Sequence, residues 1–121
     1  AHLITRDRMG RDLAFLCRVY DFGWSPLPRS ITIDEQTALL IDANGQATVA
    51  GISNVYFLTT TEAPETCQKG APLTYRNIDV YRVNAQATFD LANWAGQNGT
   101  AYTLSAENGV LISTQSNQSP Y

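Results

Sequence analysis

The chain has 121 residues, of which 44% are apolar and 16% are charged, as expected for one folded domain with a modest core. Eleven acidic side chains against eight basic ones give a net charge of -3, which disfavours general binding to nucleic acid. No apolar run approaches the roughly 20 residues that a membrane-spanning helix needs. Neither nucleic acid nor a membrane is therefore expected as a partner.

The first twenty residues predict an amphipathic helix that begins at Thr5. Apolar side chains recur there at spacings of three and four and would share one face: Met9, Leu13, Leu16, Cys17 and Tyr20. Thr5 is the expected N-cap, which places Arg6 and Arg8 in the first turn and His2 in the loop before it. Because a helix N-terminus already attracts anions, two arginines at this position favour a site for an acidic ligand.

After the helix, the period changes to that of β-strands. Gly23 and the prolines that follow it end the helix. Strands are expected over residues 30–34, 37–42, 46–51, 54–60, 73–83, 101–105 and 110–114, with Asn44-Gly45 and Asn108-Gly109 each predicting a hairpin. The continuous apolar run at 37–42 predicts a strand buried on both faces, and residues 88–95 favour a short helix or helical turn.

A single helix followed by short strands is an unusual composition for a free-standing domain. The apolar pair Leu3-Ile4 and the strand at 37–42 need apolar partners that the rest of the chain hardly supplies. We therefore expect a further segment on the N-terminal side, in a longer chain or in a separate chain left by processing.

The two cysteines leave two alternatives open. Cys17 lies on the apolar face of the expected helix, and Cys67 lies in the turn-rich segment 59–72. They either form a disulfide, which the loop-entropy model values at about 4 kcal/mol, or stand as one buried and one surface thiol. The low lysine content and the Asn-, Gln-, Thr- and Ser-rich second half favour an exported protein, secreted or periplasmic.

Candidate catalytic groups gather in two short stretches. His2 needs an orienting carboxylate to act as a general base, and either Asp34 or Glu35 could provide it. Their side chains point to opposite sides of a continuing strand, so only one of them can do so. The competing interpretation is a frayed N-terminus, solvated arginines and an acidic turn. A lone histidine cannot complete a metal shell, and no glycine-rich phosphate loop is present, so no metal or cofactor is expected.

Two motifs resemble those of a known family. Residues 2–11, HLITRDRMGR, resemble the H-F-x-x-R-x-R-x-G-R segment of the cyanophycinase-like serine peptidases, relatives of aspartyl dipeptidase. Residues 31–39, ITIDEQTAL, are similar to that family's G-I-x-I-D-E-x-T-A-L segment. The short stretches 55–58, 72–75 and 81–83 are similar to its C-terminal strands, so the resemblance runs in order up to residue 83.

The resemblance implies a flavodoxin-like α/β fold related to class I glutamine amidotransferases, with a Ser-His-Glu or Ser-His-Asp triad. His2 matches the triad base, Glu35 its orienting acid and Asp34 the alternative acid. Arg6, Arg8 and Arg11 match arginines that line the substrate site. The implied activity is exopeptidase cleavage of the arginine-aspartate polymer or of β-Asp dipeptides.

The family's nucleophile lies upstream of the histidine in a G-x-S-x-G-like motif that this chain lacks. The resemblance therefore implies that residues 1–121 are the C-terminal portion of such an enzyme, with 1–87 in the hydrolase fold and 88–121 as an extension. An N-terminal companion chain of the same precursor would supply the serine, and a homodimer of the assembled enzyme stays open. The alternative is a non-catalytic binding or structural chain derived from a processed hydrolase.

Overall fold

The computed structural model describes residues 2–121, which form one helix and nine strands in two sheets. The helix α1 spans Met9–Asp21, and the strands are β1 (Arg29–Ile33), β2 (Thr37–Ile41), β3 (Gln46–Gly51), β4 (Val55–Thr59), β5 (Tyr75–Val83), β6 (Thr88–Asp90), β7 (Ala95–Gln97), β8 (Thr100–Glu107) and β9 (Val110–Ser113). The larger sheet has the order β1-β4-β5-β8-β9, and the smaller one β2-β3-β6-β7. Every strand pairing in this described part is antiparallel.

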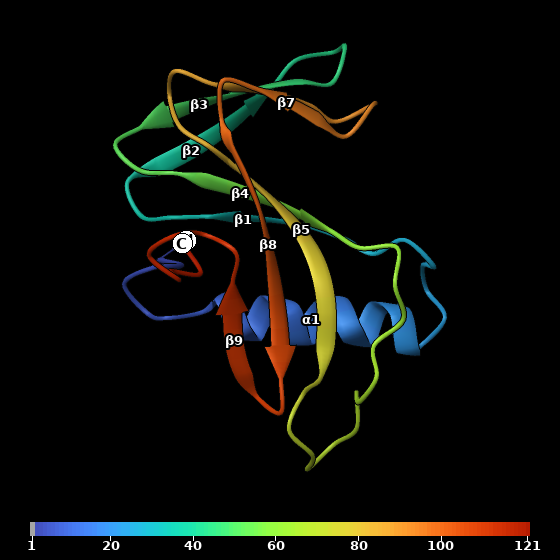
Figure 1. Ribbon diagram of the computed structural model, residues 1–121. Helices are drawn as coiled ribbons and strands as arrows, with labels where there is room; N and C mark the ends of the chain where they lie inside the picture. The colour runs from blue at the N-terminus through green and yellow to red at the C-terminus, as the bar shows by residue number, and fades with distance from the viewer. Residues whose placement is uncertain (1) are drawn as a thin grey trace.

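The larger sheet lies between two layers, α1 on one face and the smaller sheet over part of the other (Figure 1). The first core joins the apolar face of α1 to side chains of β4, β5 and β8: Met9, Leu13, Leu16, Cys17, Tyr56, Leu58, Ile78, Val80 and Leu104. The second core lies between the sheets: Ala47, Val49, Val55, Phe57, Val83, Ala87 and Phe89. Alternation along β4 sends successive side chains to the two cores, so this strand is buried on both faces.

The expected two-sided burial of residues 37–42 is wrong. The segment forms a strand, β2, but Leu40 and Ile41 are 56% and 52% exposed. These neighbouring side chains point to opposite faces, so both faces of the strand are exposed at this end. β2 is an outer strand of the smaller sheet and has only β3 beside it. An unbroken apolar run does not reveal whether a strand lies in the middle or at the rim of a sheet.

The helix begins four residues later than expected, at Met9. Residues 2–8 form turns, in which Asp7 takes the left-handed φ of 46°. Thr5 is not the N-cap, because its hydroxyl bonds to a distant side chain, and the capping position falls on Arg8 without a side-chain cap. Burial of Leu3 in the first core holds this segment against the sheet in place of a further helical turn.

Residues 88–95 also differ from expectation, because they form strands β6 and β7 joined by a turn instead of a helix. Pairing of β6 with β3 and of β7 with β6 takes the backbone of this segment into the smaller sheet. The Asp90 carboxylate accepts the backbone N–H groups of Ala92 and Asn93 at 2.9 and 3.2 Å, which closes the turn between the two strands. Trp94 completes the turn at φ 51°.

Both expected Asn-Gly hairpins are confirmed. Gly45 has φ 81°, and Asn108 and Gly109 have φ 49° and 82°, the left-handed values that such turns require. A disulfide joins Cys17 to Cys67 across a Cα separation of 6.1 Å, which fastens α1 to the loop between β4 and β5.

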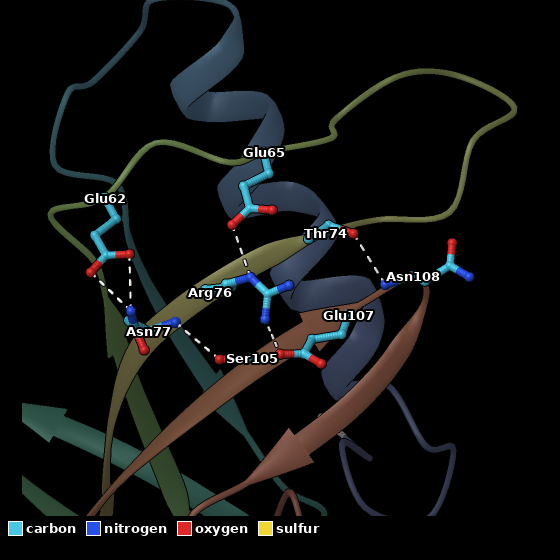
Figure 2. A network of polar contacts seen from close by, with 8 residues as sticks. All are labelled: Glu62, Glu65, Thr74, Arg76, Asn77, Ser105, Glu107 and Asn108. Atoms are coloured by element: carbon cyan, nitrogen blue, oxygen red, sulfur yellow. Dashed lines mark hydrogen bonds and ion pairs between the residues drawn. The ribbon is translucent and has the colours of Figure 1, made fainter.

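Polar contacts join the loop between β4 and β5 to the start of β5 (Figure 2). Arg76 donates to Glu65 at 2.8 Å and pairs with Glu107 on β8. The amide group of Asn77 donates to both carboxylate oxygens of Glu62, at 2.9 and 3.0 Å. β5 bulges at this point, where Asn77 has φ 58°, and the bulge turns these two side chains toward the loop.

The chain is thus a mixed α/β domain with antiparallel sheets. Residues 88–121, expected as an extension, supply β6 to β9, of which β6 pairs with β3 and β8 lies between β5 and β9. This segment therefore shares both sheets with the residues before it. No helix within residues 2–121 is long and apolar enough to cross a membrane.

Candidate active site

His2 and Glu35 meet at the end of β1, although 33 positions separate them in the chain. β1 is followed by the buried Asp34 and then by Glu35, and the chain turns at Gln36, which has a φ of 52°. His2 lies in the turn before α1 at φ 67°, a conformation that residues other than glycine rarely adopt. The distance from His2 Nδ1 to Glu35 Oε2 is 2.9 Å.

Thr5 completes the contacts of Glu35. Its hydroxyl donates to Oε1 at 2.6 Å, so both carboxylate oxygens are engaged. The Thr5 bond and the His2 contact hold the pKa of Glu35 below its ordinary value. An ionised Glu35 accepts the Nδ1–H of His2, which leaves Nε2 as the basic nitrogen of the ring. The side chains of His2 and Glu35 are 46% and 42% exposed, so the pair is open to solvent.

Asp34 takes a different role from its neighbour. It is buried, and its Oδ1 accepts the backbone N–H groups of Ile4 at 3.3 Å and Glu35 at 2.9 Å. Its Oδ2 accepts the Ser53 hydroxyl at 2.6 Å. Burial opposes ionisation, but the bond from Ser53 and the two backbone N–H groups outweigh it and lower the pKa of Asp34. Asp34 therefore joins the turn at residues 2–5 to the end of β1 and positions the pair.

The three arginines do not share one site. Arg8 and Arg11 line a hollow of about 320 Å³ beside β1, together with Asp12, Phe15 and Ile31. Arg6 is exposed on the preceding turn and does not line this hollow, and neither His2 nor Glu35 lines it. The structure thus brings the histidine to its acid and brings two arginines together nearby, without a common cleft for all of them.

Asp12, which was not among the sequence-predicted site residues, accepts hydrogen bonds from the Ser30 and Thr32 hydroxyls of β1. Burial raises its pKa, although both hydroxyls act in the opposite direction. The bonds hold the first turn of α1 against β1. The sequence did offer a signal for this contact: Ser30 and Thr32 are two positions apart on a strand, which places both hydroxyls on one face.

A second contact that the sequence did not predict joins the last residue, Tyr121, to the segment at the start of α1. The Tyr121 hydroxyl donates to Asp7 at 2.6 Å and accepts the backbone N–H of Met9 at 3.4 Å. The last residue thereby supports the start of α1. No sequence pattern signals a contact between residues more than 100 positions apart.

Comparison with known proteins gives no relative. No protein-family model matches this chain, and neither do the curated proteins or the solved structures. Within residues 2–121, no three His, Cys, Asp or Glu side chains gather in a way that could hold a metal ion.

Proposed function

We propose that this chain carries the general base and the orienting acid of a serine-type peptidase that hydrolyses arginine-aspartate polymer or β-aspartyl dipeptides. The observation that carries the proposal is the 2.9 Å contact between His2 Nδ1 and Glu35 Oε2. The resemblance of residues 2–11 and 31–39 to the cyanophycinase-like peptidases supplies the reaction class. The proposed fold is the C-terminal portion of a flavodoxin-like enzyme, secreted or periplasmic.

The geometry supports a defined route for the proton. Nε2 of His2 takes the proton of a serine hydroxyl as the oxygen attacks the scissile carbonyl, and then delivers it to the leaving amine. Glu35 holds the imidazole in the required tautomer and stabilises the imidazolium that forms. Asp34 makes its hydrogen bonds to Ile4, Glu35 and Ser53, and so positions the chain on which Glu35 lies.

The proposed nucleophile is a serine of a companion chain or segment. Among the described residues, no serine hydroxyl bonds to His2, and Ser53 donates its proton to Asp34. The exposed Arg6 and Arg11 have no ion-pair partner within residues 2–121 and are proposed ligands for substrate carboxylates. Arg11 lies in the hollow that Arg8 also lines, and Arg6 lies on the turn before α1.

The open edge of β1 is the proposed docking surface for the companion. β1 pairs only with β4. In this antiparallel ladder every second residue of β1 bonds to β4, and the bond from Asp34 N–H to the Asn54 carbonyl shows which residues do so. The N–H and C=O groups of Ile31 and Ile33 consequently face the open edge. Phe15 and Ile31 beside it are 60% and 40% exposed. Unpaired backbone groups flanked by apolar side chains fit an added β-strand.

The test uses the native assembly purified under non-denaturing conditions. A fluorophosphonate probe should label a serine of the companion, and the assembly should hydrolyse a β-Asp-Arg dipeptide. His2→Ala and Glu35→Gln are each expected to lower turnover roughly 10⁴-fold, because the base loses its function or its tautomer. The control Asp21→Asn changes an exposed acid of α1 and should leave turnover unchanged.

Turnover that survives His2→Ala, or an assembly that the probe does not label, would contradict the peptidase proposal. The non-catalytic binding or structural chain would then be the better conclusion.

A further inference from the structure

A second candidate site lies at the opposite end of β1 and β4 from His2. There the larger sheet extends beyond the cover of the smaller one, and β7 with the turn before it borders a cleft of about 510 Å³. This volume is typical of sites for small ligands. Because β1 runs from Arg29 at this end to Ile33 beside Asp34, the cleft is separate from the His2 pair.

One wall of the cleft is aromatic. Trp94 and Tyr81 form its partly exposed surface, and the buried rings of Phe57 and Phe89 support them from the second core. Phe57 and Phe89 stack with ring centroids 3.8 Å apart, and Trp94 meets both edge to face, at 5.9 and 5.1 Å. Tyr81 lies against Phe89 and accepts the backbone N–H of Gly99 at 3.0 Å. These contacts fix the rings in place, so the wall is rigid before any ligand arrives.

The tight approach of Tyr81 to the backbone depends on glycine. A Cβ built at Gly96 would overlap the Tyr81 ring, and one at Gly99 would press on the same ring. Trp94 stands beside them in the left-handed region, which is costly for a bulky side chain. Sequence and backbone together thus hold Tyr81 and Trp94 at the border of the cleft.

Beside these rings, on the same face of the larger sheet, runs a polar row. Thr59, Asp79 and Thr103 are register partners on β4, β5 and β8, so their side chains point to the same face. Thr114 follows β9 and continues the lining. The Asp79 carboxylate is exposed and has no hydrogen-bond or ion-pair partner within residues 2–121, which leaves four lone pairs available to a ligand.

The charges in and beside the cleft, the Arg29 guanidinium and the Asp79 carboxylate, are opposite and balance, so neither sign of ligand charge is favoured overall. The Arg29 guanidinium lies 4.5 Å from the centroid of the Trp94 ring, so a second cation against this ring would be repelled. An anion in the cleft would meet the Asp79 carboxylate. A neutral ring with apolar C–H faces and hydroxyl edges has neither penalty, because its faces suit the aromatic wall and its hydroxyls suit Asp79 and the threonines.

We propose that this cleft binds a neutral sugar unit of an oligosaccharide. The partly exposed rings of Trp94 and Tyr81 contact the face of the sugar ring, and Asp79 accepts two of its hydroxyl groups. This site is independent of the proposed peptidase function, since it shares no residue with the His2 pair.

Intrinsic fluorescence provides the test, because the chain has two tryptophans, Trp24 and Trp94. Trp24 is 74% exposed on the loop after α1, so Trp24→Phe should leave the fold intact and make Trp94 the sole reporter. The full chain with this change is titrated with neutral hexamers of β-1,4-linked glucose, α-1,4-linked glucose and N-acetylglucosamine, and with hexa-arginine and hexa-galacturonate. A saturable change of Trp94 emission with at least one neutral hexamer is expected.

Asp79→Asn should weaken that binding roughly tenfold or more, because the hydroxyl contacts lose their charged acceptor. Asp21→Asn, an identical change at an exposed acid outside the cleft, should leave the affinity unchanged. Circular dichroism checks that both variants fold. A response to a charged hexamer alone, no saturable response to any neutral hexamer, or equal affinities of the two variants would overturn the proposal.

Discussion

Asp34 and Glu35 are chemically similar neighbours that perform different work. Glu35 is half-exposed and contacts the imidazole, whereas Asp34 is 3% exposed and accepts three protein hydrogen bonds. Asp34 directly follows β1 and still bonds to the Asn54 carbonyl, whereas Glu35 lies in the turn that comes next. The end of the strand between these two residues therefore divides their roles.

Replacing Asp34 should destabilise the fold more than replacing a surface acid. Asp34→Ala leaves the N–H groups of Ile4 and Glu35 and the Ser53 hydroxyl without their acceptor. We expect a loss of about 1–3 kcal/mol in the free energy of unfolding, measured in urea. Asp21→Ala, at an exposed position of α1, should change it little. Equal effects of the two changes would mean that the Asp34 bonds carry no net stability.

The contribution of Asp34 should also depend on pH. Its pKa in the folded state is below the ordinary value of 3.8, so the native protein favours the ionised form. The stability from this group is therefore fully present above pH 3.8 and is lost as the pH falls through the lower folded-state pKa. The difference in unfolding free energy between wild type and Asp34→Ala, followed across this range, should shrink as the pH falls. A difference that stays constant or grows would contradict the sign.

At the scale of elements, α1 is defined by tertiary contacts more than by its own ends. It has no side-chain N-cap, and it is held by its buried face, by Asp12 on β1 and by the disulfide at Cys17. Most helical stability in proteins comes from such packing, because a nucleus of one turn is costly on its own. This explains how the first turn tolerates Arg8 at its capping position.

Removing the disulfide should cost a large part of the stability. Cys17 and Cys67 are separated by 50 positions, and the loop-entropy model assigns about 4 kcal/mol to a closure of that length. Cys67→Ser paired with Cys17→Ala should therefore unfold at a clearly lower urea concentration than the oxidised wild type. Adding a reductant should shift the wild type toward the double variant and leave the variant unchanged. Coincident curves for the oxidised protein and the variant would refute this estimate.

At the scale of the whole molecule, the outer edge of β1 is left without a neighbouring strand. The small sheet and α1 cover opposite faces of the larger sheet, but the open edge of β1 has unpaired backbone groups and exposed apolar side chains. Such an edge is a ready template for pairing with another strand. The proposed companion would both cover this edge and bring a serine within reach of His2.

A charge placed on this edge should block the companion without harming the fold. Ile31→Lys puts an ammonium group where an added strand would be buried, and we expect at least a tenfold loss of companion retained in a pull-down, or roughly 1.4 kcal/mol. Ile52→Lys is the matched control, because Ile52 is 82% exposed and lies outside β1. Full retention of the companion by Ile31→Lys would exclude the β1 edge as the docking surface.

Sequence periodicity predicted the amphipathic face of α1, most of the strands and both Asn-Gly hairpins, because these depend on local spacing and on backbone freedom at single residues. The resemblance to family motifs paired His2 with Glu35, whereas the residue pattern alone left Asp34 and Glu35 as equal candidates for the orienting acid. The disulfide could be named only as one of two alternatives, since spacing along the chain does not reveal distance in space.

The remaining features were decided by the tertiary structure. Whether β2 or β4 is buried on both faces depends on the order of strands in the sheets, which no local pattern encodes. The start of α1 depends on Leu3 entering the core, and the aromatic cleft depends on β5 and β8 reaching past the smaller sheet. The spacing of residues along the chain determines which helices and strands form, because the interactions that favour them act between near neighbours in the sequence. Contacts between residues distant in the sequence determine where these elements end and where the sites lie, because such contacts form only when the layers pack together.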